Sequence, residues 1–72
     1  MALQDRAWPE RYAQAQRHVL AGLRTIGRQR ALINRQRASG RDTRQSEELL
    51  AAFEQSQSIF EDDLVRIGRG AR

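Results

Sequence analysis

Two stripes of apolar side chains, each spaced like one face of an α-helix, flank a short link that contains Gly40. Within each stripe, successive apolar residues are three, four or seven positions apart, so a helical backbone would carry them on a single face. The pattern therefore predicts two amphipathic helices. The first stripe comprises Tyr12, Val19, Leu23, Ile26 and Ile33, and the second comprises Leu50, Phe53, Phe60, Leu64 and Ile67, together with Leu49 beside Leu50.

The ends of the two helices are marked by residues with special backbone preferences. Pro9 suits the first position of a helix, where its missing N–H is not needed. Gly40 readily adopts the left-handed conformation that ends a helix. Either Asp42, which has Gln45 three residues later, or Thr43 could cap the second helix. We therefore predict, in order, an N-terminal arm (1–8), a helix (9–38), a turn (39–42), a helix (43–67) and a frayed tail (68–72).

The short link restricts how the two helices can be arranged. A connection of about four residues brings successive helices back alongside each other. The expected fold class is therefore all-α, an antiparallel two-helix hairpin. Folding about Gly40 opposes positions whose numbers add to about 83, to within one helical turn. The pairs predicted in this way are Ile33 with Leu50, Arg30 with Phe53, Ile26 with Gln57, Leu23 with Phe60, Val19 with Leu64, and Gln16 with Ile67.

A single hairpin is expected to leave part of its apolar surface uncovered. A chain of 72 residues buries only a modest core, and this one has no cysteine with which to form a disulfide. Apolar residues outside the two stripes are Trp8, Leu20, Leu32, Ile59 and Val65. We therefore expect a homodimer in which two hairpins pack into a four-helix bundle. A monomer and a complex with a different protein are the alternatives.

Three polar residues, Arg30, Ser56 and Gln57, interrupt the apolar stripes near their middle. Buried polar groups cost free energy unless they form hydrogen bonds, and in some helical assemblies they fix the register or the oligomeric state. Arg30 could stack on Phe53, pair with Glu54 or extend past the apolar residues into water. We include Arg30 and Gln57 in the expected interface between the helices.

All 13 basic side chains are arginines, and their distribution is uneven. Residues 1–41 contain nine arginines and two acids, whereas residues 42–72 contain four arginines and seven acids. The opposite charges suggest that the two halves face each other. One group of arginines on the first helix shares the side opposite the apolar stripe, where it could bind nucleic-acid phosphates, dock an acidic protein or simply be solvated. This arginine stripe consists of Arg17, Arg24, Arg28 and Arg35.

The residue pattern does not favour catalysis or the binding of a cofactor or metal. His18 is the only histidine and is expected on the surface, away from the apolar stripe. Glu61, Asp62 and Asp63 are consecutive, so on a helix they point in different directions and do not form a paired-carboxylate site. No apolar run approaches the roughly 20 residues that cross a bilayer. We expect a cytoplasmic protein that is not an enzyme and that has no cofactor, metal or membrane partner.

Three short segments resemble a family of short, uncharacterised helical-hairpin proteins encoded in alphaproteobacterial genomes. The segments are the run Arg28-Gln29-Arg30, the turn Gly40-Arg41-Asp42-Thr43 and the sequence LLAAFEQSQ at residues 49–57. The resemblance covers residues 11–67 and implies the helical hairpin, but no established activity. Family members often carry more histidines along the first helix than the single His18, a departure that weakens any histidine-based role.

Two hypotheses about function follow from these patterns. The leading one is a protein–protein interaction module that self-associates and acts as a small regulator or adaptor. The alternative is a dimer that binds RNA or DNA through the arginine stripe. A hairpin dimer that binds RNA is known in the plasmid copy-number protein Rop, which this chain resembles in size and architecture only. The absence of aromatic residues among these arginines, where bases would stack, counts against the alternative.

Overall fold

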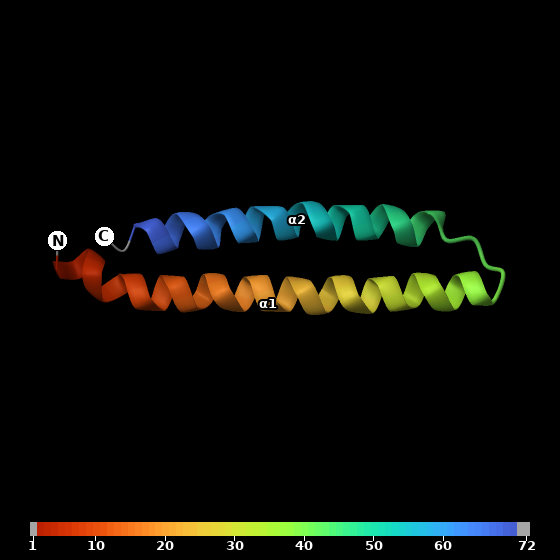
Figure 1. Cartoon of the computed structure of the whole chain (residues 1–72), viewed down its shortest axis with the longest axis horizontal. Coiled ribbons are helices and arrows are strands. Elements are labelled where there is room, and N and C mark those ends of the chain that lie inside the picture. Colours follow the sequence, from red (N-terminus) through yellow and green to blue (C-terminus); the bar gives the residue numbers. More distant parts are fainter. Residues whose placement is uncertain (1, 71–72) are drawn as a thin grey trace.

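The computed structural model describes the backbone of residues 2–70 and the side chains of residues 8–70. Helix α1 (Ala2–Ala38) and helix α2 (Arg44–Arg69) lie side by side in opposite directions (Figure 1). The molecule is a rod of 58 × 14 × 13 Å that is built from this pair of helices. The prediction of an all-α, antiparallel two-helix hairpin is confirmed.

Helix α1 begins at Ala2, seven residues before the predicted start at Pro9, which lies inside the helix. Residues 2–8 are therefore helical, and the predicted N-terminal arm (1–8) is corrected over these residues. Pro9 has no N–H to donate, and its ring crowds the carbonyl group four residues earlier, so it bends a helix without always ending it. Figure 1 shows the first turns of α1, in red, set at an angle to the rest of the helix.

Helix α1 ends at Ala38, as predicted, and glycine makes this end possible. Gly40 has a φ angle of 71°, in the left-handed region that residues with a Cβ atom rarely adopt. The backbone N–H of Arg41 donates to the carbonyl oxygen of Gln36 at 2.8 Å, and that of Gly40 donates to Arg37 at 3.0 Å. These two bonds form a Schellman motif, which satisfies the last carbonyl groups of the helix and reverses the chain.

Helix α2 begins at Arg44, one residue after the predicted start, and the expected capping box of Asp42 and Gln45 does not form. Asp42 Oδ1 instead accepts a hydrogen bond from the backbone N–H of Arg44 at 3.0 Å. The Arg44 guanidinium also binds this carboxylate, with 2.7 Å between Nη2 and Oδ2. Arg44 thereby holds the pKa of Asp42 below its ordinary value, first through its side chain and then through its backbone N–H. Thr43 occupies the cap position without capping the helix through its side chain.

Helix α2 ends at Arg69, two residues beyond the predicted end at residue 67. The backbone N–H of Gly70 donates to the carbonyl oxygens of Arg66 and Ile67, each at 3.1 Å, and so extends the last turn. Gly68 is half-buried beside Tyr12 of α1, where the missing side chain lets the two helices approach. Of the predicted frayed tail (68–72), residues 68 and 69 are therefore helical, and residues 71–72 lie outside the described part of the chain.

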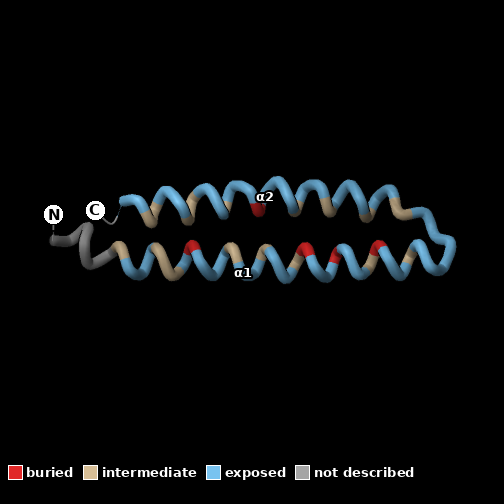
Figure 2. Tube along the Cα trace, viewed as in Figure 1, coloured by how far each residue is buried: buried red, intermediate tan, exposed pale blue. Residues whose placement is uncertain are grey.

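The core is a single line of side chains between the two helices. Figure 2 shows the buried residues along the edges that α1 and α2 turn toward each other. Ala15, Ile26 and Ile33 are the buried apolar residues of the described side chains, and all three belong to α1. Gln29 and Gln57 are buried with them. Because each helix is covered on one side only, the core is thin, and it mixes amide groups with apolar side chains.

The register of the two helices differs by about one turn from the predicted pairing. The ring of Phe60 lies against His18, with 5.4 Å between ring centroids, and the predicted partner Leu23 is 50% exposed. Gln57 contacts Gly22 and Val19, whereas its predicted partner was Ile26. The shift has a steric cause, because a glycine in α1 allows the Gln57 side chain to pack directly against the helix backbone. The predicted register was based on the large apolar residues, so it did not take Gly22 into account.

Candidate interaction surface

A groove free of charged residues runs along one flank of the helix pair. It has a volume of about 330 Å³ and is open to solvent. The groove is present because several residues of α1 and α2 on this flank have small side chains. The rings of two phenylalanines lie along its border. The lining residues, which we call the uncharged groove, are His18, Ala21, Gly22 and Thr25 of α1, and Phe53, Ser56, Gln57 and Phe60 of α2.

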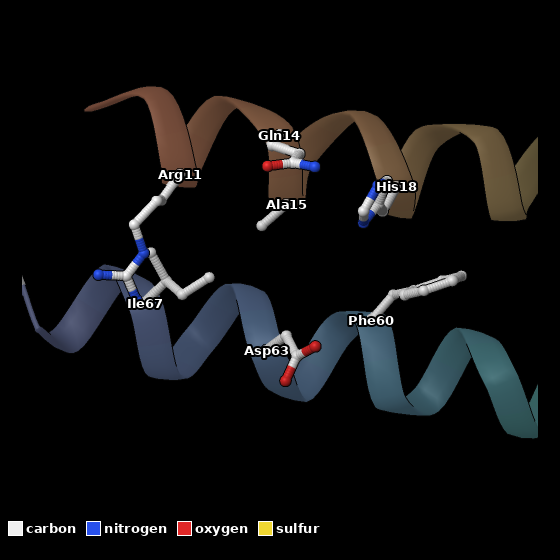
Figure 3. Close-up of a pocket in the computed structure, with 7 residues that line it drawn as sticks. All are labelled: Arg11, Gln14, Ala15, His18, Phe60, Asp63 and Ile67. Atoms are coloured by element: carbon white, nitrogen blue, oxygen red, sulfur yellow. The ribbon is translucent and has the colours of Figure 1, made fainter. Parts of the chain in front are cut away.

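The uncharged groove continues toward the open end of the hairpin into a second hollow of about 220 Å³. His18 and Phe60 line both spaces, and Figure 3 shows their side chains next to each other between the two helices. Arg11 and Asp63 bring charge to this end (Figure 3), and Asp63 is ion-paired with Arg66 one turn along α2. Charged groups therefore border the uncharged groove at its end without entering it.

The opposite flank carries the ion pairs that join the two helices. Arg30 Nη2 lies 2.8 Å from Glu54 Oε2, and Arg37 Nη2 lies 2.7 Å from Glu47 Oε1. The two arginines are seven residues apart, as are the two glutamates, so each set shares one side of its helix. The pairs are largely exposed, and such pairs contribute only about 0–1 kcal/mol each to stability. Their main effect is to make this flank, which we call the ion-pair flank, hydrophilic near the turn.

Most of the predicted interface residues lie between the helices, and two do not. Leu23 is exposed, and Arg30 is exposed and paired with Glu54, the second of the three roles predicted for it. The prediction that both residues belong to the core of the hairpin is therefore wrong, because in the observed register they lie on the ion-pair flank. The buried members are Ile26, Ile33 and Gln57, and the half-buried members are Tyr12, Val19, Leu50, Phe53, Phe60, Leu64 and Ile67.

Three polar side chains bind the backbone of the opposite helix. Gln57 Nε2 donates to the carbonyl oxygen of Val19 at 2.9 Å, and Gln29 Nε2 donates to that of Ser46 at 2.8 Å. Trp8 Nε1 donates to the carbonyl oxygen of Ile67 at 2.6 Å. The inward position of Gln57 was evident from the sequence, but the roles of Gln29 and Trp8 were not. These hydrogen bonds end on backbone carbonyl oxygens. Because every residue has such an oxygen, the pattern of side chains in the sequence does not indicate which one is bound.

Several apolar side chains remain in contact with water along the rod. They are between 46% and 57% exposed, and they occur on both helices. Of the residues expected outside the core, Leu32 and Trp8 are half-buried, and the other three are exposed. The exposed apolar set is Leu20, Leu23, Leu49, Ile59 and Val65, which corrects the prediction that Leu49 belongs to the buried stripe of the second helix.

The arginine stripe is exposed along its whole length. Arg17, Arg24, Arg28 and Arg35 are separated by seven, four and seven residues, which keeps them on one side of α1. Within residues 8–70, the four ion pairs of the structure use other arginines. The stripe therefore presents its guanidinium groups to solvent.

His18 is exposed, but it does not point away from the apolar stripe as predicted. Its ring lies over the junction of the helices against Phe60, because the register places an aromatic ring of α2 opposite it. Among the described residues, no group of three or more His, Cys, Asp or Glu side chains is arranged to hold a metal ion. Neither helix, within the described range, has an apolar stretch of the length needed to cross a membrane.

Comparison with models of known protein families, with curated proteins and with solved structures finds no match to this chain. The resemblance to the alphaproteobacterial hairpin proteins therefore stays a prediction.

Proposed function

We propose that this chain is a non-enzymatic interaction module whose hairpins associate in pairs to form a four-helix bundle. The observation that carries the proposal is the set of five apolar side chains that stay 46–57% exposed on a rod only two helices wide. In a four-helix bundle, each helix contacts two neighbours, so that side chains on its flank become part of a shared core.

The free energy available from pairing is large for a molecule of this size. Complete burial of one large apolar side chain stabilises a protein by roughly 1.5–3 kcal/mol, and a half-exposed side chain retains about half of that gain. Each exposed apolar side chain that a partner covers would therefore add about 1 kcal/mol, against a total stability of about 5–15 kcal/mol for an ordinary domain. Only three apolar residues of the described side chains are buried in the single hairpin. Pairing would therefore add buried apolar surface to a core that is thin in the single hairpin.

Sedimentation equilibrium tests the proposal directly. We expect a species of twice the 8.3 kDa chain mass at micromolar concentration. Unfolding should occur at higher temperature as the protein concentration rises, because association stabilises only the folded state. A folded, helical species of 8.3 kDa that shows no dependence on concentration would contradict the proposal.

The role that fits such a module is that of a small regulator or adaptor. The hollows described on the single hairpin are open grooves and do not enclose a small substrate. Its outer helix surfaces remain available to a different protein after pairing. Recognition of that protein would rest on charge, because the outer side of α1 carries the arginine stripe.

A second candidate function is the binding of RNA or DNA through the arginine stripe. The exposure of Arg17, Arg24, Arg28 and Arg35 favours it, since unpaired guanidinium groups along a rod can follow a line of phosphates. A gel-shift assay with RNA and with duplex DNA should show binding at low salt that weakens steeply as salt is added.

Glutamine at all four positions of the stripe should abolish this binding while leaving helicity unchanged. The control variant carries glutamine in place of Arg41 and Arg69, which are exposed and lie outside the stripe. This variant should lose only a small part of the affinity for RNA or DNA. If the wild-type chain fails to bind at low salt, the second candidate is eliminated and the interaction module stands alone.

A further inference from the structure

The two flanks of the hairpin differ in what they can pack against. The uncharged groove is bordered by exposed apolar residues of α2, because Leu49 lies seven residues and Ile59 three residues from Ser56, on the same side of the helix. The ion-pair flank, in contrast, places charged side chains over the junction of the helices near the turn. Burying those charges would cost free energy, so the groove is the better surface for a tightly packed neighbour.

A second copy of the chain matches this surface in shape. A twofold interface requires one patch to present both the hollow and the ridge that fills it. The flank of the uncharged groove has both, with small residues such as Ala21 and Ser56 beside protruding ones such as Leu49 and Ile59.

Charge then decides between the two ways in which a pair could be arranged. Helix α1 contains eight arginines and two acids, whereas α2 contains three arginines and six acids, so their net charges are +6 and −3. If both turns lie at the same end, each α1 packs against the partner's α2. If the turns lie at opposite ends, α1 packs against α1 and α2 against α2. Only the first arrangement brings opposite charges together.

We propose that a second copy of this chain packs on the uncharged groove with its turn at the same end, so that α1 of each hairpin lies against α2 of the other. The inference rests on the proposed pairing of hairpins and adds its face and its direction. The arginine stripe then remains on the outside of the bundle.

Distance measurement by electron paramagnetic resonance tests the direction. The chain has no native cysteine, so Arg41→Cys places a single spin label in the exposed turn of each hairpin. Turns at the same end should give a label separation of about 20–30 Å, two to three helix diameters. Turns at opposite ends should give a separation near the 58 Å length of the rod, and that result would overturn the inference while leaving the pairing itself intact.

Two matched substitutions test the face. Ala21 lines the uncharged groove, whereas Leu23 lies on the ion-pair flank, and both are exposed in the single hairpin. Ala21→Glu should weaken dimerisation by about 100-fold, because it would bury an unpaired carboxylate, while Leu23→Glu should leave the dimer largely unchanged. Circular dichroism confirms that both variants are helical.

The opposite outcome, dissociation by Leu23→Glu alone, would move the interface to the ion-pair flank and overturn the inference. If the wild-type chain sediments as a monomer, both the inference and the proposed pairing fail, and the groove is then left to a protein of different sequence.

Discussion

Replacing Ile33 with alanine is expected to lower the free energy of unfolding by about 2–5 kcal/mol, the usual range for truncating a buried isoleucine. Ile33 is 4% exposed, the lowest value among the apolar residues of the core. The loss has two parts. One is the free energy that was gained by burying the removed methyl and methylene groups, and the other is the cost of the cavity that remains beside α2. Because Ala15 and Ile26 are the only other buried apolar residues among the described side chains, the rest of the core has little capacity to compensate.

Leu20→Ala provides the control for this prediction. Leu20 is in the same helix and is 53% exposed, so its truncation should change the free energy of unfolding by about 0.5 kcal/mol or less. Both variants are measured by urea denaturation followed by circular dichroism, at one protein concentration because pairing would contribute to stability. Equal effects of the two substitutions would contradict the view that a narrow line of buried residues holds the hairpin together.

The hairpin itself was predictable because its causes are local. Apolar residues at helical spacing specify two one-sided helices, and Gly40 provides the left-handed residue that the turn requires. The prediction for Pro9 was wrong because proline is favourable at the start of a helix and also tolerated, with a bend, one or two turns inside it. The sequence alone does not distinguish these two situations.

The register was harder to predict because it depends on residues that lack apolar side chains. Gly22 is an empty position in a pattern of apolar residues, yet it is the place where Gln57 fits against α1. A shift of about one helical turn keeps both apolar stripes in contact, so the stripes alone favour neither alignment over the other. Hydrogen bonds from Gln57 to Val19 and from Gln29 to Ser46 make the difference, and both end on backbone atoms.

The composition of the candidate surface depends on this one-turn difference in register. With the predicted pairing, Leu23 and Phe60 would have met in the core, and no groove would separate them. In the observed register, Phe60 lies against His18, and Leu23 faces solvent on the other flank. Leu20, Ile59 and Val65 could be foreseen as exposed because they fall outside both stripes, whereas Leu23 and Leu49 were predicted within the stripes. The structure was needed to show which exposed apolar residues lie beside the uncharged groove and which lie on the ion-pair flank.

Alanine substitutions at two glycines of α1 are expected to act in opposite directions. Alanine is favoured over glycine inside a helix by about 1 kcal/mol, and a Cβ atom at Gly27 would meet nothing within 4 Å. Gly27→Ala should therefore stabilise the hairpin by about 0.5–1 kcal/mol. A Cβ atom at Gly22, in contrast, would lie 1.7 Å from Oε1 and 2.8 Å from Cδ of Gln57.

To accept alanine at position 22, the Gln57 side chain must move, although it is only 4% exposed and donates a hydrogen bond to the carbonyl oxygen of Val19. Breaking that bond leaves buried polar groups without a partner, at a cost of about 1–3 kcal/mol, which exceeds the gain in helix propensity. We expect Gly22→Ala to destabilise the hairpin by up to about 2 kcal/mol, again measured by urea denaturation.

A double-mutant cycle assigns the cause of this loss. If the clash with Gln57 is responsible, Gly22→Ala should cease to destabilise, and should become favourable, in a chain that also carries Gln57→Ala, because the added methyl group then enters the vacated space. Gly27→Ala should have the same effect in both backgrounds, since it contacts neither residue. If Gly22→Ala cost the same with and without Gln57, the packing of this amide against the α1 backbone would not be what fixes the register.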